Sequence, residues 1–265
     1  MSGGPVSLLG VEVRRRGRLI LSVENLEIGG GDFVGVVGTN GAGKTTLLKV
    51  CCGLVRPGCG EVRFDGIDWG SLSGWGKSGL RRRIGYVPQS AEYNAELPFT
   101  LREVVAMGRA SVRGLLGRLG RGDYELVDKW MERLGVAGRG GQTFRSLSGG
   151  EQQKGLIARA MVQEPEILML DEPCSNLDFN WKYEITEIID ELYREAGITI
   201  VMVSHETSLL PAGCGRLVLL DEGRVVADGG VEEVLGSAAF ERAYGCRVEI
   251  LHIGGRRYTV NTGRR

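Results

Sequence analysis

The sequence feature that most constrains this chain is a glycine-rich run that ends in a lysine and a hydroxyl residue. Residues 38–45 read Gly-Thr-Asn-Gly-Ala-Gly-Lys-Thr and satisfy the pattern G-x-x-x-x-G-K-[ST] at every defined position. The run follows residues 32–38, whose valines predict a strand, and precedes a segment whose leucines predict a helix starting near Gly43. A strand, a glycine loop and a helix in this order predict an α/β fold with a phosphate-binding loop.

The chemistry of phosphate binding explains the residue types in this run. Glycines allow the backbone to curl so that successive N–H groups point at the phosphates, and the start of a helix adds its positive end. Lys44 can neutralise the outer phosphates, and Thr45 can coordinate Mg²⁺. The candidate nucleotide-binding residues are Gly38, Thr39, Asn40, Gly41, Ala42, Gly43, Lys44, Thr45 and Thr46.

Two carboxylates follow an apolar strand in the second half of the chain. Residues 167–170 are Ile-Leu-Met-Leu, and Asp171 and Glu172 come directly after them. Because nucleotides bind at the carboxyl ends of the strands in parallel α/β sheets, this strand delivers both carboxylates to the binding edge. Asp171 is the natural partner of Mg²⁺, and Glu172 can polarise an attacking water. Together with the glycine loop, this pair predicts a P-loop nucleoside triphosphatase.

Predicted strands and helices alternate along the chain. The predicted strands are 6–13, 18–28, 32–38, 83–88, 167–170 and 198–203, with a hairpin at 216–221 and 224–228. After the helix near Gly43, the predicted helices are 100–107, 123–134, 149–162 and 183–195. The alternation predicts a mainly parallel sheet covered on both faces, with a helical block inserted at about 90–147.

Composition and charge narrow the class of protein. The 265 residues include 33 Lys and Arg and 33 Asp and Glu, so the formal net charge is zero and we expect no nucleic acid partner. No apolar run reaches the roughly 18 residues that a membrane span needs, and residues 1–13 lack the pattern of a secretory signal. The six cysteines form no C-x-x-C pair, so we expect them to be reduced and mostly buried. These features are typical of a cytosolic protein.

A second helix start with adjacent glycines precedes the acidic strand. Residues 147–154 read Leu-Ser-Gly-Gly-Glu-Gln-Gln-Lys, in which Ser148 and Glu151 form a capping box. The two glycines leave backbone N–H groups accessible at the positive end of the helix. Capping boxes are common and most of them bind nothing, so this segment alone favours a structural role over a functional one.

In its context, this segment closely resembles the signature sequence of the ATP-binding cassette (ABC) family. Gln89 follows Lys44 by 45 residues and resembles the glutamine of the family's Q-loop. Ser148 precedes Asp171 by 23 residues, which matches the family's order and spacing. Further along, His205 resembles the switch histidine, and a Ser-Asn-Leu-Asp run at 175–178 resembles the D-loop.

The resemblance covers residues 5 to about 235 and implies a fold. It implies a P-loop NTPase core of the RecA-like type, with an antiparallel β subdomain and an inserted helical subdomain at about 90–147. The ABC ATP-binding domain is then expected at 1–235, and a C-terminal tail at 236–265 is expected to hold a short helix and strands.

The resemblance also implies ATP and Mg²⁺ as cofactors and assigns roles. In that family two ATP-binding subunits pair head to tail, and each ATP lies between the glycine loop of one chain and the signature of the other. A homodimer is therefore expected, in which Ser148, Gly149 and Gly150 bind the partner's γ-phosphate and Asp178 bridges the two sites. The implied catalytic residues are Glu172, His205 and Gln89, and the implied Mg²⁺-binding residues are Thr45, Gln89 and Asp171.

One departure concerns the nucleotide base. The family usually places an aromatic residue ahead of the glycine loop to stack on adenine, whereas here the register from Gly17 to Leu21 places Arg15 at that position. An arginine plane can stack on a base, and the basic run 14–16 can equally be a solvated edge.

The segment after Gln89 suggests what the ATPase drives. Residues 97–109 and the tail segment 231–245 resemble importers of metals and metal chelates, namely iron–siderophore, haem, cobalamin, zinc or manganese. This implies an ATP-hydrolysing importer subunit at the cytoplasmic face of the cell membrane. Its expected partners are two transmembrane permease subunits and an extracytoplasmic substrate-binding protein.

Other readings compete with import. The apolar stripe of Leu101, Val104 and Val105 in the first of these segments can equally be core packing. A non-transport ABC ATPase that acts on nucleic acid or ribosomes is an alternative, although the chain lacks the second cassette, sustained heptads and basic faces typical of that group. The ATPase subunit of an ABC exporter shares the same catalytic motifs.

Overall fold

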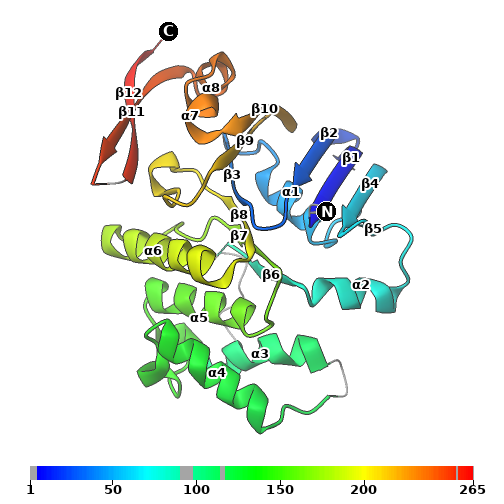
Figure 1. The fold of residues 1–265 in the computed structure, drawn as a ribbon, viewed down its shortest axis with the longest axis vertical. Coiled ribbons are helices and arrows are strands. Elements are labelled where there is room, and N and C mark those ends of the chain that lie inside the picture. The colour runs from blue at the N-terminus through cyan, green and yellow to red at the C-terminus, as the bar shows by residue number, and fades with distance from the viewer. Residues whose placement is uncertain (1–4, 90–97, 114–116, 255, 265) are drawn as a thin grey trace.

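One ten-stranded sheet runs through most of the molecule (Figure 1). The computed structural model describes residues 5–89, 98–113, 117–254 and 256–264. The strand order is β5-β4-β1-β2-β10-β9-β3-β8-β7-β6. The strands are β1 (Val6–Arg15), β2 (Arg18–Ile28), β3 (Phe33–Gly38), β4 (Cys59–Phe64), β5 (Ile67–Asp68), β6 (Ile84–Val87), β7 (Ile167–Asp171), β8 (Thr199–Val203), β9 (Arg216–Asp221) and β10 (Arg224–Gly230).

The sheet has an antiparallel part and a parallel part. Strands β5, β4, β1 and β2 pair antiparallel, as do β9 and β10, whereas β9, β3, β8, β7 and β6 run parallel. The expected α/β class with an antiparallel β subdomain is thus confirmed. The sequence analysis did not predict β4, β5 or the helix that follows them, because the segment from 53 to 81 is rich in glycine and charge and lacks a clear apolar period.

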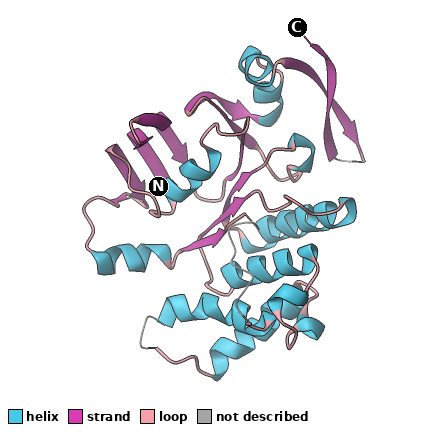
Figure 2. Cartoon of the chain, turned by 180° about the vertical axis from the view of Figure 1, so that it is seen from behind, coloured by secondary structure: helices cyan, strands magenta, loops and turns pink. Residues whose placement is uncertain are grey.

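The helices lie beside and below the sheet. They are α1 (Lys44–Cys51), α2 (Gly74–Arg81), α3 (Leu101–Arg113), α4 (Arg121–Arg133), α5 (Gly149–Met161) and α6 (Phe179–Ala196), with single 3-10 turns η2 (Ala137–Arg139), η3 (Phe144–Ser146) and η4 (Thr207–Leu209). Seen from behind, α3, α4 and α5 gather below the strands (Figure 2). None of the helices in the described ranges is both long and apolar enough to cross a bilayer.

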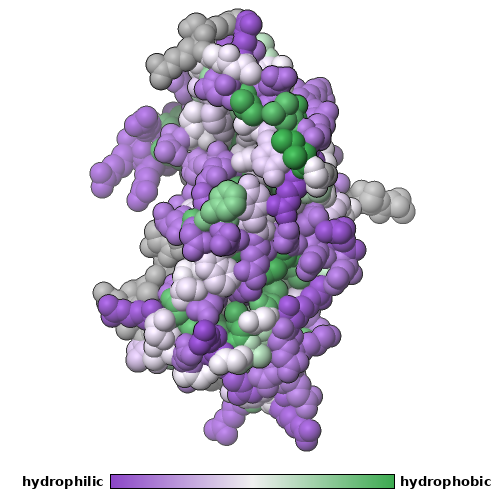
Figure 3. All heavy atoms as spheres, turned by 90° about the vertical axis from the view of Figure 1, so that its left-hand side faces the viewer, coloured by the Kyte–Doolittle hydropathy of each residue, from purple (hydrophilic) through white to green (hydrophobic). Residues whose placement is uncertain are grey.

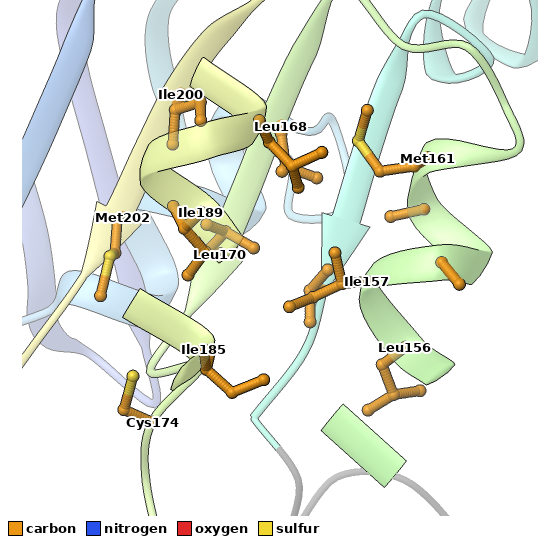
Figure 4. Close-up of a cluster of buried hydrophobic side chains, with 14 of the residues drawn as sticks. Leu156, Ile157, Met161, Leu168, Leu170, Cys174, Ile185, Ile189, Ile200 and Met202 are labelled. Carbon is orange, nitrogen blue, oxygen red and sulfur yellow. The ribbon is translucent and has the colours of Figure 1, made fainter. Parts of the chain in front are cut away.

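The parallel strands are buried on both faces, as expected. In β7, Leu168 and Leu170 belong to one hydrophobic core, while Ile167 and Met169 belong to the other. Strand β8 alternates in the same way, because successive side chains of a strand point to opposite faces. Figure 4 shows the first core, where helices α5 and α6 pack their Ile157, Ile185 and Ile189 against the strands.

The helical block packs against α5 and belongs to the first of these two cores. Helix α3 continues to Arg113, beyond the expected end near residue 107, because Arg109 and Arg113 both bind the buried carboxylate of Asp123 on α4. The stripe of Leu101, Val104 and Val105 is fully buried in the core, so core packing accounts for it. The expected block 90–147 includes residues 90–97 and 114–116, which lie outside the described residues.

The C-terminal tail contains two short helices and a hairpin. These elements are α7 (Val231–Leu235), α8 (Ala238–Tyr244), β11 (Cys246–Ile253) and β12 (Arg256–Arg264). Strands β11 and β12 form a separate two-stranded sheet at one end of the molecule (Figure 1). The tail thus contains two strands and, with α7 at its start, two short helices where one was expected.

The cysteines behave as expected. All six are free, and Cys51, Cys52, Cys174 and Cys214 are buried. Burial raises the pKa of the Cys51 thiol to about 12, so it stays neutral at physiological pH.

Candidate nucleotide-binding site

The glycine loop joins β3 to α1, and at two of its positions the surrounding backbone leaves no room for a side chain. Gly38 has φ 153° and Gly43 has φ 97°. A Cβ on Gly38 would lie 2.2 Å from the carbonyl oxygen of Leu220, and a Cβ on Gly43 would lie 2.7 Å from that of Ile20. These close approaches explain why glycine is required there and leave the loop free to turn its N–H groups inward.

Lys44 lies under this loop and is 5% exposed. Its Nζ donates to the carbonyl oxygens of Gly38 at 2.8 Å and Thr39 at 3.0 Å. Burial lowers the pKa of Lys44, although the nearby carboxylates of Glu172 and Asp171 act in the opposite direction. The buried ammonium group of Lys44 therefore lies at the loop, where it can bind an anionic ligand.

Thr45 and Asp171 form a pair of oxygen donors at the start of α1 and the end of β7. Thr45 Oγ1 donates to Oδ1 of Asp171 at 3.0 Å, and the carboxylate is completely buried. Tyr86 also donates to Oδ2 of Asp171, at 3.3 Å. A hydroxyl beside a carboxylate suits a hard cation such as Mg²⁺, which prefers oxygen ligands. The sequence analysis missed Tyr86, although it stands in the same Tyr-Val-Pro-Gln run as Gln89.

The carboxylate of Glu172 contacts side chains that follow the two strands flanking β7. Gln89 Nε2, just beyond β6, donates to Glu172 Oε2 at 2.9 Å. His205, which follows β8, contacts Glu172 Oε1 through its Nε2, while its Nδ1 lies 3.4 Å from Lys44 Nζ. Glu172 itself has φ 51°, a left-handed conformation that turns its side chain out of the strand direction. Three adjacent strand ends thus bring the expected catalytic residues together.

A cavity of about 450 Å³ opens over these groups. Its lining consists of Ile20, Asn40, Gly41, Gly43, Lys44, Thr45, Thr46, Gln89, Glu172 and His205. Ile20 is therefore the residue by which the β1–β2 hairpin lines the cavity. Arg15 is exposed at the end of β1 and does not belong to this lining. The expected contact of Arg15 with the base stays a prediction.

The signature residues lie apart from this cavity. Ser148 caps α5: its Oγ accepts from the N–H of Glu151 at 3.3 Å, and Glu151 Oε2 accepts from the N–H of Ser148 at 2.9 Å. Ser148 and Gly149 are exposed, while Gly150 is covered by Trp181. Asp178 caps α6 by accepting from the N–H of Trp181 at 3.0 Å. Within the described residues, one chain does not bring these groups to the glycine loop.

Trp181 is a residue that the sequence analysis missed. A Cβ on Gly150 would lie 1.9 Å from its ring, and Lys154 Nζ lies 5.1 Å from the ring centroid. Gly150 therefore has a packing role, and its expected role at the helix start stays a prediction. Periodicity within one helix gives no signal for a contact between α5 and α6.

Comparison with known proteins points to one family. A family model described as ABC transporter matches residues 21–175. The cobalamin import ATP-binding protein of Halobacterium salinarum is 38% identical over 92% of this chain, which spans only 60% of that relative's length. The ferric enterobactin transport ATP-binding protein of Escherichia coli is 35% identical, with 91% of this chain and 89% of the relative covered. The hemin import ATP-binding protein of Bordetella avium is also 35% identical, with 91% and 92% covered.

Solved structures agree with the sequence relatives. A putative metal-chelate type ABC transporter in an inward-facing conformation matches with a TM-score of 0.82 at 23% identity, covering 99% of this chain and 98% of that chain, which supports the fold alone. A dimeric ATP-binding cassette bound to ADP and Pi matches with a TM-score of 0.75 at 28% identity, covering 85% of this chain and 98% of that chain. Because the family model spans more than half of the chain and contains its glycine loop and acidic strand, the chain belongs to the ABC transporter family.

Proposed function

We propose that this chain binds and hydrolyses ATP as the ATP-binding subunit of an ABC importer. The observation that carries the proposal is the convergence of Lys44, Thr45 and the Gln89–Glu172–His205 cluster on one cavity, with the buried Asp171 hydrogen-bonded to Thr45. A cradle of backbone N–H groups, a buried ammonium and a carboxylate poised near a cavity are the parts that phosphoryl transfer to water requires.

Each group has a role in this reaction. The loop N–H groups and Lys44 bind the phosphates, and Thr45 and Asp171, together with Gln89, hold Mg²⁺. When bound, Mg²⁺ neutralises charge on the phosphates. Glu172 accepts hydrogen bonds in the structure, so its carboxylate can orient and polarise the attacking water. His205 contacts both Glu172 and Lys44, a position from which it can donate to the γ-phosphate.

The second half of each site is proposed to come from another copy of the chain. Ser148 and Gly149 are exposed at the positive end of α5, where backbone N–H groups can bind an anion. Within the described residues, this end of α5 lies apart from the glycine loop of its own chain. A head-to-tail homodimer would place the partner's glycine loop against it, with Asp178 between the two sites. The ADP-bound relative solved as a dimer supports this arrangement by analogy.

The proposed cargo is a metal or metal chelate. The support is that the relatives are named for import of cobalamin, ferric enterobactin and hemin. The chain is proposed to act at the cytoplasmic face of the membrane with two permease subunits and an extracytoplasmic substrate-binding protein. A groove of about 630 Å³ between α2, β6 and α3 is a suitable place for a permease segment, because Leu54, Ile84 and Ala110 make its wall largely apolar.

Two measurements test the proposal. The purified chain is expected to release phosphate from Mg-ATP, and Lys44→Ala is expected to lose both nucleotide binding and turnover. Tagged protein recovered from native membranes is expected to bring a polytopic membrane protein with it. Recovery of nucleic acid or ribosomes instead would favour the non-transport alternative, and a wild-type chain that hydrolyses no ATP would contradict the enzymatic assignment.

A further inference from the structure

The C-terminal hairpin contacts η4, which comes shortly after His205 in the sequence, and helix α6. Thr259 Oγ1 on β12 lies 2.6 Å from Thr207 Oγ1 on η4. Arg256, also on β12, forms an ion pair with Glu187 on α6, and its guanidinium carbon lies 4.9 Å from the centroid of the Tyr183 ring. Strand β12 therefore bridges η4 and α6.

Of these two segments, η4 adjoins the nucleotide cavity, which His205 lines, whereas α6 begins at Asp178, outside the lining of that cavity. Thr207 follows His205 by only one intervening residue, Glu206, and Asp178 is the N-cap of α6. An ion pair between Lys182 and Glu206 links the two segments directly. The backbone of His205 is thus connected to α6 on one side and, through Thr207, to the hairpin on the other.

One face of the hairpin packs against the core, and Arg256 on the other face pairs with α6. Val248 and Ile250 pack against the core, and Arg257 Nη2 donates to the carbonyl oxygen of Cys214 at 3.0 Å. On the opposite face Ile253 is 61% exposed and Val260 is 43% exposed. Figure 3 looks onto the side of the molecule that carries the hairpin, which is mostly hydrophilic with a few apolar side chains exposed near the top. The attached face therefore offers a fixed support for η4.

We infer that Thr259 and Arg256 are positioning residues that hold the segment around His205 in place at the γ-phosphate site. This inference rests on the proposed ATPase function. His205 lies on a loop, and loops open locally at a low free-energy cost unless they are tethered. Loss of the Thr207 tether lets His205 spend less time against Glu172, which lowers the fraction of molecules competent for hydrolysis.

The test uses the full chain with matched variants. Thr259→Val removes the hydroxyl at constant shape, and Arg256→Ala removes the ion pair. Each is expected to lower kcat for ATP by roughly fivefold, with KM for ATP and the melting temperature unchanged, because one hydrogen bond or ion pair of this kind is lost. Thr259→Ser is expected to restore kcat. Val260→Thr, adjacent on the same strand but facing solvent, is the control and is expected to match the wild type.

Amide hydrogen exchange separates this inference from the proposed function. In both variants the amides of residues 204–209 are expected to exchange faster, while those of β7 are not. This measurement needs no ATP hydrolysis. A wild-type chain without ATPase activity would refute the proposed function, whereas the exchange rates would still test whether the hairpin holds residues 204–209. Unchanged exchange in 204–209, or a loss of kcat that Val260→Thr shares, would overturn the inference.

Discussion

Nε2 of Gln89 donates a 2.9 Å hydrogen bond to Oε2 of Glu172, although the two residues are 83 positions apart. They meet because β6 and β7 are neighbours, with Val87 paired to Leu170. The other oxygen of the same carboxylate contacts His205 beyond β8. The side chain proposed to polarise water is therefore held by residues that follow both flanking strands.

Replacing Glu172 by glutamine tests its role as the water-polarising group. Glu172→Gln keeps the size of the side chain and the phosphate cradle but removes the carboxylate. We expect steady-state phosphate release to fall by about 10²–10⁴-fold while equilibrium ATP binding is retained. Glu24→Gln, an exposed change on β2, serves as the control. Turnover equal to that of the wild type would eliminate this role.

The same variant tests the shared site. Without hydrolysis, Glu172→Gln with Mg-ATP is expected to form a dimer, seen as a doubled mass by light scattering after sizing chromatography. Adding Ser148→Arg places a large side chain at the exposed start of α5 and is expected to keep the protein monomeric. A strictly monomeric Glu172→Gln profile with ATP would refute the head-to-tail model.

Gly150→Ala tests the packing of α5 against α6. Because a Cβ at this position would lie 1.9 Å from the Trp181 ring, we expect a loss of about 1–3 kcal/mol in the free energy of unfolding. Gly149→Ala is the matched control, since its Cβ would meet only the flexible end of Leu177, at 3.1 Å. Denaturant titration measures both changes.

A double variant completes this test. In Gly150→Ala with Trp181→Ala, the cost of adding the methyl group is expected to be largely removed. If Gly150→Ala cost the same with and without the tryptophan, the packing role assigned to Gly150 would be wrong.

Asp123 makes the stability of the helical block depend on pH. Hydrogen bonds from Arg113 and from the N–H of Gly120 hold the pKa of this carboxyl well below its usual range, with Arg109 adding a further bond. Because the folded pKa is lowered, the stabilisation is complete above the unfolded pKa near 3.9 and is lost as the pH falls toward the folded pKa.

Asp123→Asn is accordingly expected to lower the melting temperature by several degrees at pH 7, since it removes the buried carboxylate that Arg109 and Arg113 share and leaves Arg109 with Glu164 alone. The difference from the wild type is expected to shrink below about pH 4. Glu125→Gln on the same helix removes only the exposed partner of Arg121 and serves as the control. A difference that stayed constant from pH 7 to pH 3 would contradict the linkage.

Local sequence determined the parts of the site that depend on backbone geometry. The loop at 38–45 needs glycine where φ is positive and where a carbonyl oxygen lies close. These requirements fall on residues that are near one another in the sequence. The capping box of Ser148 and Glu151, and the buried run that ends in Asp171, are equally local. Such patterns can be read without knowing the strand order, because each involves neighbours in sequence.

Only the tertiary structure decided which distant groups meet. Tyr86 reaches Asp171, Trp181 covers Gly150, and Ile20 rather than Arg15 lines the cavity, each through contacts between separate elements. The order of strands in the sheet and the packing of α5 on α6 create these contacts. Periodicity and spacing describe one element at a time, so they predict what each element presents but not the neighbour against which it is placed.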